Sequence, residues 1–400
     1  MSAIKLILKI RKHLNKVLWN LRNILPENWQ FILFQPPEGA TRTEEYCIKN
    51  DHPFYKIRDK IEIERTLPDT PDKEVHWKFH KKLHYTYREI WVASIPELCV
   101  IGRFGHILTP NRLLLTDASY HLGSQNPFEH ALFKEFVTVP KKERLDGTST
   151  ILTGPSTRGY FHWLTDSLPR LLLLEKAGYS LDKIDHFIIP KGELSAMGET
   201  LDLLGIDAKR RYEATARSII TASQMVLPSM PGHSGNPAPE VREFLRRHFL
   251  EPAKRVSKSF PKRFYISRKR TRRIKNEDKL LPVLEKYDIQ TVSPEHLSFL
   301  EQVALFAGAE LIVAPHGAAL TNLVFSSPKT SVIELFSPNY VNICYWSISN
   351  LGNLRYSYIL GEGKRPSSYK DLHQVRKDIT APVKTVERWL ESWAIRDGNN

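Results

Sequence analysis

The fold is decided by residues 295–336, which read EHLSFLEQVALFAGAELIVAPHGAALTNLVFSSPKTSVIELF. Ser298 and Glu301 have the spacing of a capping box, and the apolar residues after them recur at helical intervals until a glycine, which predicts a helix. The apolar runs 311–314 and 332–336 each have the length and composition of a buried strand. The segment is therefore predicted to form a helix, a strand, a turn, the start of a second helix and a second strand.

Between the two predicted strands, residues 315–319 (PHGAA) almost lack side chains apart from the imidazole of His316. Small residues directly after a strand let a ligand approach the backbone, and the free amides at the start of a helix attract anions. Glu334 lies inside the second strand, where a charge is costly unless it has a partner. These features predict a binding site for a phosphate or a nucleotide.

The composition is that of a soluble globular protein. The chain has 400 residues, of which 41% are hydrophobic and 26% charged, and this length suggests two domains. A formal net charge of +14 indicates acidic partners such as phosphorylated substrates, nucleic acid or an anionic membrane. RNA-binding and zinc-finger signatures are absent, so no nucleic-acid partner is expected. The three scattered cysteines argue against disulfides or a cysteine metal site, and fit a reducing compartment.

Residues 4–25 predict a basic amphipathic helix. Apolar residues from Ile7 to Ile24 recur every three or four positions, and lysines and arginines fill other positions, with no acid before Glu27. Such a helix can lie on an anionic membrane surface, or it can pack on its own domain or on a partner. A secretory signal would show an uninterrupted apolar core, and no run approaches the roughly 18 apolar residues of a membrane-spanning helix.

Changes in composition along the chain predict its domains. Short strand-like runs begin near residue 89 and predict antiparallel strands, after which βα units follow. A basic, polar stretch at 251–261 marks the expected boundary between two α/β domains. The expected divisions are an amphipathic helix at 1–35, an extended lead-in with a few edge strands at 36–88, an N-terminal α/β domain at 89–252, a C-terminal α/β domain at 253–362, and a tail with a final amphipathic helix at 363–400.

Residues 159–170 (GYFHWLTDSLPR) place a histidine and an acid on one face of a predicted helix. His162, Asp166 and Arg170 are four residues apart, and apolar residues occupy another face. Pro169 cannot donate a backbone hydrogen bond and is expected to kink the helix. This combination indicates a functional site. The alternative is an Asp166–Arg170 ion pair beside a core histidine.

Several catalytic signatures are absent. The sequence contains no GxGxxG, GxxxxGK[ST], HExxH or GxSxG motif, and no Asp-x-Asp pair, so catalysis without a metal is preferred. Arg268 ends the predicted strand 263–268, and ligands bind beyond the carboxyl end of such a parallel strand. Arg268 also opens the basic run 268–273, which by itself is typical of a solvated loop. Two βα domains with this loop and the small-residue turn suggest group transfer from a nucleotide-activated donor in a cleft between the domains.

The ordered set of motifs resembles glycosyltransferase family 61. The resemblance covers about residues 90–340, and the matching stretches are residues 159–166, Ser267-Arg268 with Asn276, Glu301-Gln302, and residues 316–322 (HGAALTN) through Phe325 to Glu334. It implies two Rossmann-like domains facing across a cleft (GT-B type). It also implies an inverting, metal-independent transfer of a sugar to a glycan acceptor from a nucleotide sugar, expected to be UDP-linked and bound by the C-terminal domain. No cofactor beyond this donor is implied.

The resemblance allows roles to be proposed for individual residues. Inversion needs a base that takes the proton of the acceptor hydroxyl. Asp166 is the first candidate for this base and His162 the second. The residue that is not the base is expected to orient the other or to bind the acceptor. Arg268 is expected to neutralise the charge of the diphosphate. His316 and the backbone amides after it are expected to stabilise the leaving group. The alternative for His316 is that it only caps the next helix. The other donor-binding candidates are Asn276, Gly317, Ala318, Thr321 and Glu334. Glu334 is expected either to accept from ribose hydroxyls or to pair with a loop cation.

The expected setting is a bacterial cytoplasm. Animal and plant members of the family commonly work in the secretory pathway behind a membrane anchor, and this chain shows neither an anchor nor many cysteines. We therefore expect a cytoplasmic enzyme of surface or capsular polysaccharide synthesis, held peripherally at the inner face of the plasma membrane. Two alternatives remain, a non-catalytic polysaccharide-binding or scaffold protein that retains the fold, and another nucleotide-dependent α/β enzyme such as a phosphotransferase or epimerase. The sequence predicts no oligomeric state.

Overall fold

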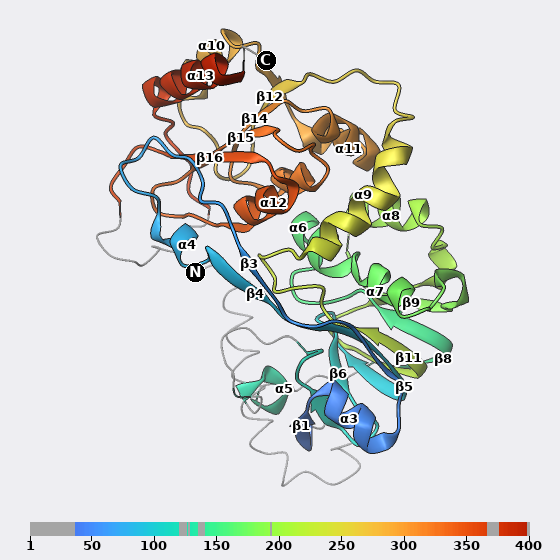
Figure 1. The fold of residues 1–400 in the computed structure, drawn as a ribbon. Helices are drawn as coiled ribbons and strands as arrows, with labels where there is room; N and C mark the ends of the chain where they lie inside the picture. Colours follow the sequence, from blue (N-terminus) through green and yellow to red (C-terminus); the bar gives the residue numbers. More distant parts are fainter. Residues whose placement is uncertain are drawn as a thin grey trace, which may run out of the picture.

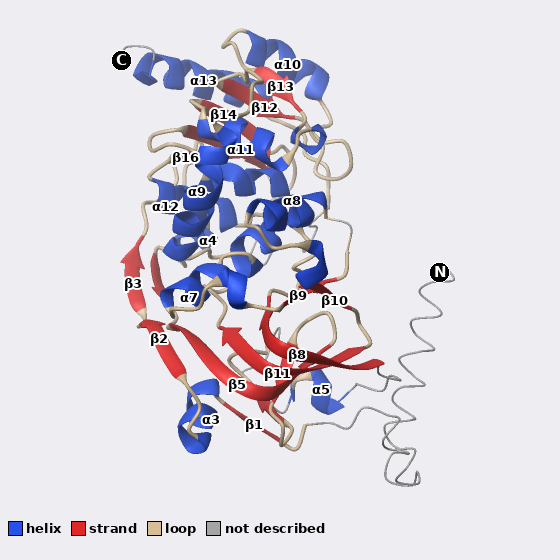
Figure 2. Ribbon diagram, turned by 90° about the vertical axis from the view of Figure 1, so that its right-hand side faces the viewer, coloured by secondary structure: helices blue, strands red, loops and turns tan. Residues whose placement is uncertain are grey.

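The computed structural model describes residues 37–119, 126, 129–134, 141–192, 194–365 and 376–397. Two large sheets are separated by a layer of helices (Figures 1 and 2), and this confirms the predicted α/β class. The amphipathic helix predicted at residues 4–25 lies outside the described residues, so its contact with a membrane stays a prediction. Within the described ranges, no helix is both long and apolar enough to span a bilayer.

The upper sheet in Figure 1 has five parallel strands in the order β13-β12-β14-β15-β16. Numbered along the chain, this order is 2-1-3-4-5, which is that of a doubly wound sheet. The order reverses between β12 and β14, so the loops after these two strands flank the point where such sheets bind ligands. The strands are β12 (Arg263–Ile266), β13 (Gln290–Val292), β14 (Leu311–Pro315), β15 (Ser331–Phe336) and β16 (Arg355–Leu360).

Helices cover both faces of this sheet because side chains along its strands alternate between two cores. In β14, Leu311 and Val313 pack with α10 and α13, whereas Ile312 and Ala314 pack with α11 and α12. The predicted capping box and the terminating glycine of α11 are confirmed, and so is the amphipathic tail helix α13. After β14 the chain forms a 3₁₀ helix, η6. The bounds are α10 (Glu277–Glu285), α11 (Phe299–Ala307), η6 (Ala318–Val324), α12 (Cys344–Gly352) and α13 (Val383–Asp397).

The lower sheet has nine strands and is mixed. Its order is β1-β7-β6-β5-β11-β8-β9-β10, with β2 also paired to β5; β8 to β11 run parallel, and β5 is antiparallel to its neighbours. The predicted antiparallel strands are present, although residues 90–93 and 98–101 belong to one long strand. The strands are β1 (Gly39–Thr41), β2 (Phe54–Arg58), β5 (Ile90–Ile101), β6 (His106–Leu108), β7 (Leu113–Leu115), β8 (Lys141–Ile151), β9 (His186–Pro190), β10 (Arg211–Ala214) and β11 (Ser218–Pro228).

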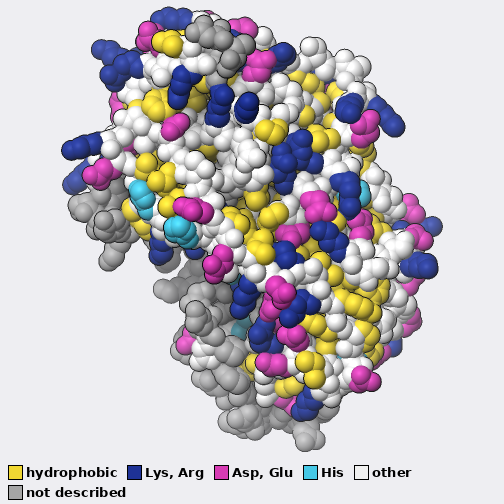
Figure 3. All heavy atoms as spheres, viewed as in Figure 1, with side chains coloured by type: hydrophobic (Ala, Val, Ile, Leu, Met, Phe, Trp, Pro, Cys, Tyr) yellow, Lys and Arg dark blue, Asp and Glu magenta, His cyan; other side chains and the backbone are white. Residues whose placement is uncertain are grey.

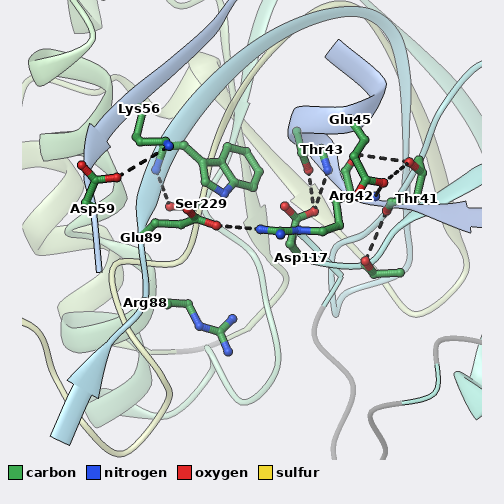
Figure 4. Close-up of polar contacts among 12 residues, drawn as sticks. Thr41, Arg42, Thr43, Glu45, Lys56, Asp59, Arg88, Glu89, Asp117 and Ser229 are labelled. Atoms are coloured by element: carbon green, nitrogen blue, oxygen red, sulfur yellow. Dashed lines mark hydrogen bonds and ion pairs between the residues drawn. The ribbon is translucent and has the colours of Figure 1, made fainter. Parts of the chain in front are cut away.

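The lead-in before residue 89 is more ordered than its composition indicated. It contains α3 (Thr43–Asn50), α4 (Trp77–His80), the edge strands β1 and β2, and a separate hairpin of β3 (Ile61–Glu64) and β4 (His84–Tyr87). Two contacts in Figure 4 attach it to the sheet: the 2.6 Å ion pair of Arg42 with Glu89 and the 2.7 Å hydrogen bond from the Thr43 hydroxyl to Asp117. Arg42 is half exposed, so its pair contributes little, whereas the buried Thr43 bond is the stronger attachment.

The helices between the sheets are packed into one core that both sheets share. This core includes Phe161 and Phe244 from the N-terminal half and Phe325 and Trp346 from the C-terminal half. Along the chain, the strands of the lower sheet come before residue 229 and those of the upper sheet come after residue 262. The exact domain boundaries predicted from the sequence stay predictions. The intervening helices are α6 (Tyr160–His162), the π-helical turn η2 (Trp163–Ser167), α7 (Arg170–Lys176), α8 (Ser195–Leu203) and α9 (Pro239–Ala253).

Charged side chains of both signs are spread over the face of the molecule shown in Figure 3. Lysines and arginines occur over both halves, with acidic residues between them, so this face has no single basic patch. The net charge of +14 is therefore a poor guide to the site, and individual cations must be examined by their contacts.

Candidate active site

His162 and Asp166 lie where a helix changes type. The α-helical turn of α6 is followed by η2, in which the amide of Leu168 donates to the carbonyl of Trp163 at 2.9 Å, and α7 begins after Pro169. Proline has no N–H and interrupts the regular hydrogen-bond pattern. The irregularity predicted at Pro169 is therefore present as a π-turn, a feature that occurs frequently at functional sites.

The carboxylate of Asp166 accepts three side-chain hydrogen bonds. Nδ1 of His162 lies 2.8 Å from Oδ2, the hydroxyl of Ser234 donates to the same oxygen at 2.7 Å, and the hydroxyl of Thr165 donates to Oδ1 at 2.9 Å. The side chain of Asp166 is 6% exposed and that of His162 is 31% exposed. Because Nδ1 faces the carboxylate, Nε2 of His162 is the ring nitrogen available to a substrate.

Ser234 comes from the loop 229–238, which the sequence did not mark as functional. Its neighbour His233 is held between two residues of the lead-in: Nδ1 lies 2.9 Å from the hydroxyl of Tyr85, and Nε2 accepts from Nε of Arg88 at 3.1 Å. Burial and the charges of Arg88 and Lys82 lower the pKa of His233 to about 4, which keeps it neutral at neutral pH. The lead-in thereby holds Ser234 against the His162–Asp166 pair.

Replacing Ser234 with alanine is expected to lower kcat about tenfold, because a hydrogen bond to a charged group contributes roughly 1.5–3 kcal/mol. The KM of the donor is expected to stay unchanged, since Ser234 contacts Asp166 in the N-terminal half and the donor is expected to bind the C-terminal half. Steady-state kinetics of Ser234→Ala, with Ser223→Ala in strand β11 as the control, would measure both values. Equal kcat for Ser234→Ala and the parent protein would show that this serine does not support Asp166.

The alternative of an Asp166–Arg170 ion pair is wrong. Arg170 is buried, and its guanidinium donates to the carbonyl of Pro228 at 2.6 Å and to that of Thr153 at 3.3 Å. Burial lowers its pKa to about 9. Since Thr153 follows β8 and Pro228 ends β11, Arg170 fixes the starts of two loops beneath the His162–Asp166 pair.

His316 follows β14 and is paired with Glu334 of β15. Nδ1 of His316 contacts one oxygen of Glu334, and the hydroxyl of Tyr356 donates to the other oxygen. Burial raises the pKa of the Glu334 carboxyl well above its usual range, and burial with the charges of Arg272 and Arg268 holds the pKa of His316 well below its own. Because both oxygens of Glu334 have protein partners, the geometry favours an orienting role for it over ribose binding, and its partner is a histidine rather than a loop cation.

Arg268 lies across Gly317 at the switch point of the upper sheet. A Cβ atom on Gly317 would lie 1.7 Å from Nη1 of Arg268, so only glycine leaves room for the guanidinium. Burial lowers the pKa of Arg268, and the charge of Arg272 lowers it further. Arg272 has a left-handed backbone (φ 57°) and a buried Nε without a partner among the described residues. Two neighbouring guanidinium groups of this kind have the charge and geometry to bind an anion such as a diphosphate.

The remaining predicted donor residues have structural contacts. Asn276 exchanges two hydrogen bonds with the backbone of Ala381, at 2.9 and 2.8 Å, so its amide is fully used there. Thr321 is buried and donates to the carbonyl of Ala318 at 2.6 Å, while Ala318 itself is exposed at the start of η6. In the described ranges, no three His, Cys, Asp or Glu side chains are grouped to hold a metal ion. The structure therefore brings together Arg268, His316 and Gly317, but not Asn276.

The two halves of the site meet through aromatic residues. The hydroxyl of Tyr160 in α6 donates to Asn322 of η6 at 2.6 Å. The ring of Tyr345 in α12 lies 5.9 Å from that of Phe161 and 5.0 Å from that of His316, measured between centroids. The helix with His162 and the turn with His316 therefore flank one ring, which the sequence did not mark because Tyr345 belongs to no motif.

A carboxylate-oriented histidine and a pair of guanidinium groups at the switch point of a doubly wound sheet are features that group transfer from a phosphorylated donor requires. Residues 160–333 match the model of the family Glycosyltransferase 61. The resemblance seen in the motifs is thereby confirmed over residues 160–333, which are less than half of the chain.

Two curated relatives each match part of this chain. The chain is 38% identical over 96 residues to the EGF domain-specific O-linked N-acetylglucosamine transferase of Drosophila melanogaster, which is 23% of this chain and 18% of the relative. It is 30% identical over 89 residues to the Beta-1,2-xylosyltransferase RCN11 of Oryza sativa subsp. japonica, which is 22% of this chain and 16% of the relative. The match thus spans less than a fifth of each relative.

Proposed function

We propose that this protein is a glycosyltransferase that moves a sugar from a nucleotide sugar to a glycan-type acceptor with inversion at the anomeric carbon. The observation that carries the proposal is the placement of the His162–Asp166 pair and the Arg268–Arg272 anion site on either side of the Tyr160–Asn322 contact. The family match over residues 160–333, and two relatives that are named as sugar transferases, support it. A GT-B arrangement, with the donor on the C-terminal half, is part of the proposal.

In this mechanism His162 is the base. Asp166 is almost buried and already accepts three hydrogen bonds, so it is poorly placed to take a further proton, whereas Nε2 of His162 is accessible. As the acceptor oxygen bonds to the anomeric carbon, its proton moves to Nε2, and Asp166 stabilises the imidazolium that forms. The contacts thus favour His162 over Asp166 as the base, the opposite of the order expected from the sequence.

The leaving nucleoside diphosphate is proposed to lie beyond the carboxyl ends of β12 and β14. As the bond between the anomeric carbon and the phosphate oxygen breaks, negative charge grows on the diphosphate, and Arg268 with Arg272 stabilises it. Gly317 leaves space for Arg268, and His316, oriented by Glu334, supports the wall of this site. The nucleotide is proposed to be UDP, with no cofactor beyond the donor and no requirement for a metal.

The acceptor class remains a choice between two candidates. The sequence favours surface or capsular polysaccharide made in the cytoplasm by a peripherally attached enzyme, and this stays our first candidate. The fly relative is named for its action on EGF domains, and that supports a glycoprotein acceptor as the second candidate. Capsular oligosaccharides and a folded EGF-like domain, offered with the same donor, would separate the two.

A thermal-shift screen of nucleotide sugars, followed by an assay of donor hydrolysis, tests the proposed function. A donor at a hundredfold excess over its Kd should stabilise the native state by about 2.7 kcal/mol and raise the unfolding midpoint. UDP-sugars are expected to do so more than GDP-sugars or free sugars. Binding without turnover of any donor would favour the non-catalytic scaffold, and transfer of a phosphoryl group would favour a different nucleotide-dependent enzyme.

A further inference from the structure

A cavity of about 420 Å³ lies beyond the carboxyl ends of β8 and β9. Its walls come from the hairpin after β5, from the loop after β8 and from the loop after β9; the residues that matter are Arg103, Phe104, Ser156, Thr157 and Arg158. Since β8 and β9 are parallel neighbours, the cavity occupies the edge of the lower sheet where ligands of α/β proteins bind. The Arg268–Arg272 site occupies the corresponding edge of the upper sheet.

The walls of this cavity are fixed by hydrogen bonds. The hydroxyl of Thr157 donates to the carbonyl of Gly154 at 2.8 Å and accepts from its amide at 3.2 Å, which closes a tight turn. The hydroxyl of Thr153 donates to the carbonyl of Arg103 at 2.6 Å and fastens the hairpin to this turn. A Cβ on Gly105 would lie 2.9 Å from the carbonyl oxygen of Thr153, so the close approach requires glycine. The cavity is therefore preformed.

The side chains in the cavity suit an acidic sugar. Neither Arg103 nor Arg158 forms an ion pair with any residue that the structure describes; Glu193, which precedes the lining residue Leu194, lies outside those residues. The ring of Phe104 is 43% exposed, with the guanidinium carbon of Arg103 5.1 Å from its centroid. Guanidinium groups bind carboxylates in a fixed geometry, and an exposed aromatic ring provides a flat apolar surface for the C–H face of a sugar.

The cavity adjoins the proposed base. Arg158 is followed directly by Gly159, the residue that starts α6, and a Cβ on Gly159 would lie 3.7 Å from Cδ2 of His162. The imidazole of His162 therefore lies close to Gly159, and the residue before Gly159, Arg158, belongs to the cavity wall. A sugar held in the cavity therefore has its neighbouring units next to His162.

We propose that this cavity binds an acidic sugar residue of the acceptor through its carboxylate and thereby presents a hydroxyl of the adjoining sugar to His162. The inference rests on the proposed glycosyl transfer and defines its acceptor as an acidic glycan. Arg103 and Arg158 hold the carboxylate, and Phe104 covers one face of the ring.

Binding of an oligosaccharide that contains glucuronic acid, compared with its carboxyl-reduced counterpart, tests this inference by calorimetry. The intact protein is expected to bind the acidic form about tenfold more tightly or better, as charge-assisted hydrogen bonds would give. Arg103→Gln and Arg158→Gln should each reduce this preference, and the double variant should remove it. Arg255→Gln, an exposed arginine that lines neither site, is the matched control and should keep it.

The same variants distinguish failure of this inference from failure of the proposed function. The rise in unfolding midpoint caused by UDP should be unchanged in Arg158→Gln; loss of that rise would assign the cavity to the donor and overturn the inference. Equal affinity of the intact protein for both oligosaccharides would also overturn it, and so would equally strong competition by inorganic sulfate, which would indicate a general anion site. If the protein prefers the acidic oligosaccharide but turns over no nucleotide sugar, the acidic-glycan site is supported and the proposed transferase function is refuted.

Discussion

Replacing His162 with glutamine is expected to reduce the kcat of sugar transfer about 10³-fold, within the range that a general base contributes. Donor affinity should be unchanged, because His162 contacts Asp166 and Ser234 and lies in the half of the molecule opposite Arg268. Transfer or donor hydrolysis gives the rate, and the UDP-induced shift of the unfolding midpoint gives the affinity. A similar loss of both would indicate a misfolded protein rather than a missing base.

Chemical rescue decides between the two candidate bases. If His162 takes the proton, added imidazole should restore part of the activity of His162→Gly and none of that of Asp166→Asn. Asp166→Asn should itself lose most activity, because an amide at this position favours the wrong tautomer of the imidazole. If formate restores Asp166→Gly while His162→Gln keeps its turnover, the base is Asp166, the first candidate of the sequence analysis.

Replacing Gly317 with alanine is expected to weaken UDP binding at least tenfold without lowering stability. The new methyl would occupy the position of Nη1 of Arg268, which is the end of a flexible side chain, so the guanidinium moves while the backbone does not. Calorimetry with UDP and thermal unfolding measure the two effects. Gly198→Ala is the matched control, since a Cβ there meets nothing within 4 Å. Unchanged UDP affinity in Gly317→Ala would place the diphosphate elsewhere.

A double-mutant cycle makes the donor-site test sharper. Arg268→Ala should also weaken UDP binding at least tenfold, with a similar loss for Arg272→Ala. If Gly317→Ala acts by displacing Arg268, it should cost little further affinity in the Arg268→Ala background. Additive losses would mean that residue 317 contacts the ligand directly.

Local signals explain how much of the fold was predictable. Residues 295–336 carry a capping box, a terminating glycine and two apolar strands, and all of these are present in the structure. Two elements gave no such signal. Strand β8 reads KKERLDGTSTI and is nearly free of apolar residues although its end is buried, and α12 buries Ser347 and Ser349 completely. Patterns of hydrophobicity miss elements whose buried positions are polar.

The residues of the candidate site also include some that the sequence predicted and some that it did not. The pairing of His162 with Asp166 follows from spacing along one helix, and the position of Arg268 follows from the strand before it. Ser234 and Tyr345 reach the site through contacts between distant segments, and spacing along the chain carries no information about those. Arg272 was hidden in a run of cations that resembled a solvated loop.

The core that both sheets share limits how substrates enter and leave. Separating the halves would expose large aromatic side chains such as Phe161 and Trp346, and would break the bond from Tyr160 to Asn322. Rigid-body opening about a hinge is therefore costly, since interfaces between mobile domains are more polar than this one. Donor exchange is instead expected to follow movement of the loops at 268–273 and 229–238, with the two sheets remaining in place throughout turnover.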